Sequence, residues 1–196
     1  MVDELVKDIK DYATINNVPI ILDASMDFLT DLILKNNVKN ILEIGTAIGY
    51  SAIKMALINK DIKVTTIEKE KDRYLLAVKN VKKVGLEDQI TLVYNDAMEV
   101  KLKDKFDLIF IDAAKSKNEE FFKKFEGNLN SKGIIVTDNL SFHGYVNKDI
   151  SEIESKNIRG LVKKIKNYIG FLGTNRKYKT NFYDIGDGLS VSEKRN

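Results

Sequence analysis

Ile41-Leu-Glu-Ile-Gly-Thr-Ala-Ile-Gly-Tyr-Ser51 is the stretch that decides the fold. It opens with an apolar run typical of a buried strand and continues into a turn bracketed by Gly45 and Gly49, after which apolar residues recur at helical spacing. Glycine lets the backbone adopt positive φ and lets a ligand approach the main chain, and a helix that begins here offers unpaired N–H groups. The stretch therefore predicts a strand that delivers a nucleotide-like ligand to the start of a helix.

Two acids near this turn indicate which ligand binds. The glycine spacing is not the G-x-G-x-x-G of dinucleotide-binding proteins, and Glu43 would repel a pyrophosphate but accept hydrogen bonds from the ammonium of an amino-acid head group. Glu68 ends the next predicted strand, about 20 residues downstream, where an acid grips a ribose diol. Together the two acids favour S-adenosylmethionine over NAD. The alternative is a loop of any α/β domain with two incidental surface acids.

Composition limits the remaining possibilities. With 196 residues, one proline and no obvious linker, we expect a single domain over residues 1–196. The absence of cysteine excludes disulfides, thiolate zinc sites and cysteine nucleophiles, and the single histidine, His143, excludes a multi-histidine metal site. No apolar run has signal-peptide or membrane-spanning length, so we expect a soluble, cytoplasmic protein that does not contact membranes.

Strand and helix patterns alternate along most of the chain. Two helical patterns form an N-terminal extension over residues 1–37, and βα units follow the glycine turn, which predicts a mainly parallel sheet with helices on both faces. Gly186-Asp187-Gly188 lies between two strand-like runs and predicts a closing antiparallel hairpin. The predicted helices span residues 3–15, 23–36, 71–84, 118–129 and 151–169, and the later strands span 63–68, 90–95, 106–112, 133–138, 178–185 and 189–193.

Polar residues end two neighbouring predicted strands. Asp112 follows one apolar run and Asp138-Asn139 follows the next, so the three side chains should meet at the ligand-binding edge of the sheet. Their oxygens suit Mg²⁺ or a similar divalent ion. The alternative is that Asp112 caps a helix and Asp138-Asn139 begins an ordinary turn. Lys115, one helical turn beyond Asp112, favours the metal interpretation.

The order of elements resembles the class I methyltransferase fold, a Rossmann-like, mostly parallel sheet of seven strands with an antiparallel last strand. Within it, Asp112-x-x-Lys115 followed by Asp138-Asn139 resembles the metal-dependent O-methyltransferases, a family that includes catechol and caffeoyl-CoA methyltransferases. The resemblance implies that Asp112, Asp138 and Asn139 hold a divalent ion that chelates two adjacent substrate oxygens. It also implies that Lys115 takes the hydroxyl proton. Lys115, as the base, and Asp112, as a ligand of the ion, are therefore the expected catalytic residues.

The same resemblance assigns a cofactor site. Asp96-Ala97, at the end of the third strand, would face the adenine, and Tyr50 and Ser51 would contact the methionine portion, although Ser51 could equally be a plain N-terminal helix residue. The expected S-adenosylmethionine contacts are Glu43, Gly45, Thr46, Gly49, Tyr50, Ser51, Glu68, Asp96, Ala97 and Asp112.

Several segments resemble a bacterial branch of this family that methylates 5-hydroxyuridine at the tRNA wobble position to 5-methoxyuridine. They include Asn17-Val18-Pro19-Ile20, Thr137-Asp138-Asn139, Gly186-Asp187-Gly188-Leu189 and a basic helix from Arg159 to Lys166. The resemblance implies that the partner is a tRNA anticodon loop and that the protein forms a homodimer. Basic side chains near the site would hold loop phosphates and make binding salt-sensitive. The candidates are Arg159, Lys163 and Arg176.

Other interpretations stay open at this point. The chain could methylate small vicinal diphenols, or bind the cofactor without catalysis, and the basic segment could be a solvated helix face. The loop from Ser141 to Tyr145 is expected to form a lid or substrate wall, in which His143 has no catalytic role. Phe142 or Tyr145 either stacks on a flipped base or packs under the loop.

Overall fold

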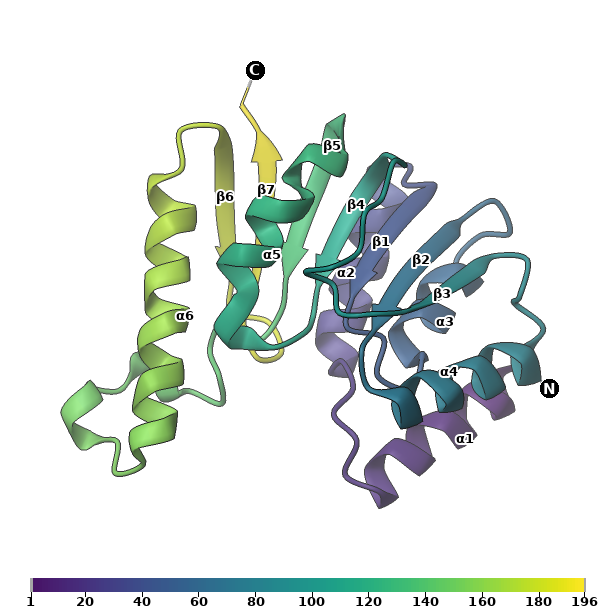
Figure 1. The fold of residues 1–196 in the computed structure, drawn as a ribbon, viewed down its shortest axis with the longest axis horizontal. Helices are drawn as coiled ribbons and strands as arrows, with labels where there is room; N and C mark the ends of the chain where they lie inside the picture. The colour runs from purple at the N-terminus through teal and green to yellow at the C-terminus, as the bar shows by residue number, and fades with distance from the viewer. Residues whose placement is uncertain (1, 196) are drawn as a thin grey trace.

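The computed structural model describes residues 2–195. Within them, seven strands form one sheet and six α-helices pack around it (Figure 1). The helices are α1 (Val2–Ile15), α2 (Asp23–Lys35), α3 (Tyr50–Leu57), α4 (Lys71–Val84), α5 (Asn118–Phe125) and α6 (Lys156–Thr174). The strands are β1 (Asn40–Ile44), β2 (Lys63–Glu68), β3 (Ile90–Tyr94), β4 (Phe106–Ile111), β5 (Leu129–Thr137), β6 (Tyr178–Tyr183) and β7 (Leu189–Lys194).

The sheet has the order β3-β2-β1-β4-β5-β7-β6. The first five strands pair in parallel, whereas β7 is antiparallel to both β5 and β6. The seven-stranded, mostly parallel sheet with an antiparallel last strand is therefore confirmed, as is the hairpin at Gly186-Asp187-Gly188. The strand order reverses between β1 and β4, and ligands of such sheets bind at the carboxyl ends of the strands at this switch point.

Both faces of the sheet are covered, which explains why the central strands are almost continuously apolar. In β1, Ile41 faces a core shared with α1 to α4, and Leu42 faces the other core, shared with α5 and α6. Figure 1 shows α5 in front of the sheet and α2 behind it. Because alternate residues of a strand share a face, Glu43 lies on the same side as Ile41 and is buried with it.

The two N-terminal helices belong to the first of these cores. Ile9 of α1 and Leu29 and Ile33 of α2 are almost fully buried in the same cluster as Ile41 of the sheet. The helices of the N-terminal extension, predicted over residues 1–37, therefore pack on the sheet and supply much of one layer.

Element ends differ from the predicted ones mainly around α6. The helix predicted from residue 151 begins at Lys156, where the Ser155 hydroxyl accepts a hydrogen bond from the Ile158 N–H, and it extends to Thr174. Residues 150–152 instead form a separate short 3₁₀ turn capped by Asp149. None of the helices within residues 2–195 combines the length and apolar character needed to cross a membrane.

Candidate active site

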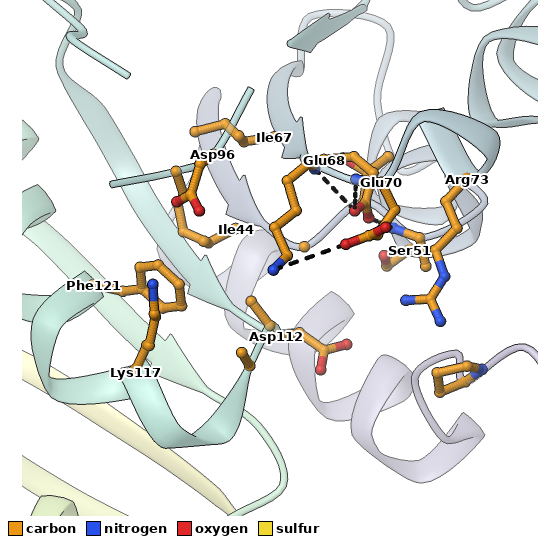
Figure 2. A pocket seen from close by; sticks show the side chains of 18 of the residues that line it. Ile44, Ser51, Ile67, Glu68, Glu70, Arg73, Asp96, Asp112, Lys117 and Phe121 are labelled. Carbon is orange, nitrogen blue, oxygen red and sulfur yellow. Dashed lines mark hydrogen bonds and ion pairs between the residues drawn. The ribbon is translucent and has the colours of Figure 1, made fainter. Parts of the chain in front are cut away.

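A cavity of about 740 Å³ opens at the carboxyl ends of β1, β2 and β4, where the strand order reverses. Its volume suits a cofactor-sized ligand. Figure 2 shows Phe121 and Lys117 on one side of the cavity, and Ser51 and Arg73 on the other. Ten of the residues predicted for the site line it, namely Gly45, Thr46, Tyr50, Ser51, Glu68, Asp96, Ala97, Asp112, Lys115 and Asn139.

The glycine turn has the predicted backbone conformation. Gly45 and Gly49 have φ angles of 101° and 84°. A Cβ atom on Gly45 would lie 2.1 Å from the carbonyl oxygen of Asp112, so only glycine lets the end of β1 approach the end of β4 this closely. Gly49 does not line the cavity, and a Cβ atom there would lie 3.4 Å from the Cβ of Ala77 in α4.

Gly45→Ala is expected to destabilise the protein by roughly 3 kcal/mol or more, because left-handed strain and a backbone clash add together. Gly85 is a matched control: its φ is 74°, and a Cβ there would meet no atom within 4 Å. Gly85→Ala should therefore lose only the strain term of about 1 kcal/mol. Urea unfolding measures both, and equal losses would show that the contact with Asp112 is unimportant.

Glu68 joins the end of β2 to the glycine turn. It is 7% exposed, and its carboxylate accepts hydrogen bonds from the N–H groups of Ala47, Lys69 and Glu70, each at 2.9 Å (Figure 2). These three hydrogen bonds fix the side chain where it lines the cavity.

Glu43 differs from its prediction, because its carboxylate does not reach the cavity. It is completely buried and accepts hydrogen bonds from the hydroxyls of Ser51 and Thr66, each at 2.5 Å. The Thr66 hydroxyl also lies 2.6 Å from that of Thr46. Burial raises the pKa of Glu43 to about 8, although the two hydroxyls oppose the rise. In this structure Glu43 therefore orients Ser51, which does line the cavity, and makes no contact with the cavity itself.

This buried acid predicts a pH effect on stability. The folded pKa of about 8 lies above the ordinary value of 4.5, so between these pH values the folded protein keeps a proton that the unfolded chain releases. Stability should therefore fall as pH rises through this window. Thermal melts from pH 5 to 8.5 should show a shallower decline for Glu43→Gln than for the wild type. A control, Glu87→Gln at an exposed position, should match the wild type, and parallel curves for all three proteins would contradict the assignment.

Two carboxylates meet at the ends of β4 and β5. Burial raises the pKa of Asp112 to about 6 and that of Asp138 to about 7, and the charge of Asp112 adds to the rise at Asp138. Asp138 is 2% exposed; its Oδ1 accepts the Asn139 N–H at 2.7 Å, but its Oδ2 is buried without a hydrogen-bond partner. A half-buried acid beside a buried one that has an unpartnered oxygen suits a cation.

Lys115 lies within this group. Its Nζ donates to the Asn139 Oδ1 at 2.5 Å, and its charge lowers the pKa of both acids. Asn139 has a φ of 64°, a left-handed conformation that asparagine tolerates better than most residues. The structure thus brings together the four residues predicted to perform the chemistry, and the oxygens of Asp112, Asp138 and Asn139 are hard ligands of the kind that Mg²⁺ prefers.

The three basic residues predicted to hold RNA do not line the cavity. The Arg159 guanidinium donates to the carbonyl oxygens of Ile153 and Glu154 and fastens the preceding loop to α6. Lys163 is exposed on α6. Arg176 precedes β6, which begins at the edge of the sheet where β5 also begins, so it lies at the opposite edge from the cavity. The reason is the length of α6, whose 19 residues span about 28 Å.

Sequence reasoning missed several lining residues. Pro19, Ile20 and Ile21, between α1 and α2, form one part of the wall, and Arg73 and Phe121 form others. Phe121 lies on the helix predicted from residue 118, but nothing in its spacing marked it as a lining residue. Nothing in the local sequence indicates that the loop between α1 and α2 reaches this edge.

In the loop after β5, from Ser141 to Tyr145, the aromatic side chains pack against neighbouring residues. Phe142 packs against the second core and contacts the rings of His143 and Tyr145, with centroid distances of 5.6 and 5.8 Å. The Lys148 ammonium lies 4.8 Å from the Tyr145 ring. These aromatic residues do not line the cavity.

Comparison with known proteins gives a consistent result. A family model described as O-methyltransferase matches residues 1–195. A caffeoyl-CoA O-methyltransferase of Populus kitakamiensis is 28% identical over 193 residues, which cover 94% of this chain and 82% of that protein. A crystal structure from Staphylococcus aureus, provisionally described as a caffeoyl-CoA O-methyltransferase, has a TM-score of 0.92 at 40% identity and covers 97% of this chain and 92% of its own. The SAH-bound methyltransferase PaMTH1 of Podospora anserina shares the fold, with a TM-score of 0.87 at 20% identity and coverage of 98% and 88%.

Proposed function

Because the chain belongs to the O-methyltransferase family, we propose that it transfers a methyl group from S-adenosylmethionine to a hydroxyl oxygen with the help of a divalent metal ion. The observation that carries the proposal is the meeting of Asp112, Lys115 and Asn139 on the wall of one cavity with the glycine turn. A nucleotide-like cofactor and an acceptor hydroxyl can therefore occupy neighbouring parts of the same space.

The residues present fit a divalent ion. Asp112, Asp138 and Asn139 offer carboxylate and amide oxygens, and the unpartnered Oδ2 of Asp138 is a buried acceptor that needs a cation or a donor. A divalent ion held there would lower the pKa of an adjacent substrate hydroxyl and fix that oxygen in place.

The protein's own groups complete the transfer. The Nζ of Lys115, in its neutral form, accepts the hydroxyl proton, and the oxygen forms a bond to the methyl carbon as the carbon–sulfur bond breaks. The bonding electron pair stays on sulfur, which leaves as a neutral thioether. Ser51, Glu68 and the glycine turn hold the cofactor, so the two reactants meet in a fixed orientation, which supplies much of the rate enhancement.

We propose a tRNA wobble 5-hydroxyuridine as the acceptor, with 5-methoxyuridine as the product. The 5-hydroxyl and 4-carbonyl of this base are adjacent oxygens, and a single-stranded anticodon loop can release the base from its stack. Basic residues near Lys115 support tRNA as the acceptor. Lys117 lines the main cavity, and Lys164 lines a smaller one of about 290 Å³ that shares Lys115 with it. Lys117 and Lys164 are therefore better candidates for phosphate contacts than Arg176.

A small vicinal diphenol is the second candidate acceptor. It has the same pair of adjacent oxygens, and several relatives are named for caffeoyl-CoA or flavonoid substrates. In its favour, the acidic pair and Lys115 need no RNA contact to carry out the chemistry.

Competition between the two acceptors tests the assignment. The kcat/KM for tRNA carrying 5-hydroxyuridine should greatly exceed that for free catechol, and its KM should rise steeply with salt because phosphate contacts release counterions. Efficient catechol turnover with silent tRNA would instead assign the protein to small-molecule methylation.

A further inference from the structure

The segment that follows Asp138 is held in an unfavourable backbone conformation. Asn139, Phe142 and His143 have φ angles of 64°, 47° and 54°. A left-handed conformation costs a non-glycine residue about 1–2 kcal/mol, and it persists only where neighbouring structure enforces it. Three such residues within five positions therefore require an external constraint.

The turn between β6 and β7 provides this constraint. The Ser141 N–H donates to the Asp187 carbonyl oxygen at 2.7 Å, and the Leu140 N–H donates to the Gly188 carbonyl oxygen at 2.9 Å. A Cβ atom on Gly188 would lie 2.8 Å from the Ser141 nitrogen, so the two backbones are in close contact. Figure 1 shows this turn at the carboxyl end of β5.

One side chain reaches further along the segment than these backbone contacts. Asp187 is 6% exposed, and its Oδ1 accepts a hydrogen bond from the His143 N–H at 2.5 Å. Its Oδ2 is buried without a hydrogen-bond partner, and its charge is close enough to act on Asp138. The desolvation of an acid is unfavourable, and the carboxylate gains two contacts with His143: the hydrogen bond from its N–H, and its imidazole Nδ1 at 3.9 Å from the Asp187 Oδ2.

We propose that Asp187 is a positioning residue that holds residues 139–143 in their left-handed path and thereby aims Asn139 at the divalent ion. The inference rests on the proposed function, because that function makes Asn139 a ligand. Asp187 contacts neither ion nor substrate; it acts through the backbone between His143 and Asn139. The required property is a side-chain acceptor at this position, which asparagine also supplies.

Two readouts on the full chain test the role. Hydrogen exchange of the amides of residues 140–145 reports the path of the segment without metal, and Mn²⁺ affinity, measured by electron paramagnetic resonance, reports the ligand set. Asp187→Ala should raise the exchange rate about 10-fold or more and weaken Mn²⁺ binding about 10–100-fold, the range for loss of a partner that orients a metal ligand. Asp187→Asn should restore both, and SAH affinity should stay unchanged in each variant.

Control variants separate this role from general effects. Asp184→Ala removes the other acid of the same turn, which is exposed. His143→Asn removes the imidazole, which is 76% exposed and 3.9 Å from the Asp187 Oδ2, but keeps the backbone N–H on which the proposal depends. Both should behave as the wild type. If Asp187→Ala fails to fold, Gly188→Ala displaces the segment at Ser141 and should accelerate exchange and weaken Mn²⁺ binding similarly.

The proposal is overturned if Asp187→Ala matches the wild type in exchange, or if Asp187→Asn is as defective as Asp187→Ala. Failure of the proposed function has a different signature. The wild type would then bind no Mn²⁺, while the exchange data would still show whether Asp187 holds the segment.

Discussion

Lys115→Ala is expected to lower kcat for methyl transfer by about 10²–10⁴-fold, the contribution typical of a general base. The lysine lines the cavity and donates to the Asn139 Oδ1, so it lies beside the proposed ligands of the ion. The glycine turn and Glu68, which hold the proposed cofactor, lie on β1 and β2 and do not depend on it. Cofactor affinity should therefore be retained, and single-turnover kinetics should place the defect in the chemical step.

A surface lysine provides the control for this substitution. Lys103 is exposed in the loop before β4, and Lys103→Ala should leave kcat unchanged. A Lys115→Ala protein with full activity would show that Lys115 is not the base of the reaction.

Asp138→Asn is expected to have opposite effects on activity and stability. Loss of a proposed metal ligand should reduce methyl transfer by more than the 10–100-fold caused by losing an outer-shell partner. In the presence of a chelator, however, the variant should be more stable than the wild type at pH 8 by about 1–3 kcal/mol, because it removes a buried charge whose Oδ2 has no hydrogen-bond partner. Asparagine keeps an oxygen for the Asn139 N–H.

The stability difference between Asp138→Asn and the wild type should depend on pH. The folded pKa of Asp138, about 7, lies above the ordinary value of 3.8, so the folded protein keeps the proton in this window and loses stability as the pH rises through it. The stability gain of Asp138→Asn should be small at pH 4 and complete by pH 8. Chelated thermal melts at several pH values measure it, with Asp104→Asn, at an exposed acid, as the control. A variant that is less stable at pH 8 would show that the folded protein stabilises the charge of this carboxylate.

The sheet could be predicted from sequence because each central strand is an apolar run followed by a polar or glycine residue. The rule that ligands bind at the carboxyl ends of parallel strands then placed Asp112, Asp138 and Asn139 together without any contact information. Their proximity is confirmed by the Lys115 contact with Asn139 and by the electrostatic interaction between the two acids.

Side-chain direction was the harder property to predict. Glu43 was expected at the ligand, but the alternation of a strand places it on the face of Ile41, under the helices, where Ser51 and Thr66 bind it. Because β1 is apolar on both faces, its sequence does not show which face each side chain takes.

Long-range placement was not accessible from one sequence. Arg176 and Arg159 lie close together in the sequence of the basic segment, yet α6 carries them to opposite ends of the sheet. Likewise, the approach of Asp187 to His143 joins residues 44 positions apart through a hairpin and a loop whose relative position depends on the sheet order.

The most direct test of the central claim is the chelator dependence of methyl transfer to 5-hydroxyuridine. Purified protein is incubated with S-adenosylmethionine and tRNA that carries this base, with Mg²⁺ or with chelator, and the digested nucleosides are analysed by mass spectrometry. The proposed site predicts 5-methoxyuridine with Mg²⁺, its loss with chelator, and its return when Mg²⁺ is added back. The same yield of 5-methoxyuridine in chelator would contradict a metal-dependent site at Asp112, Asp138 and Asn139.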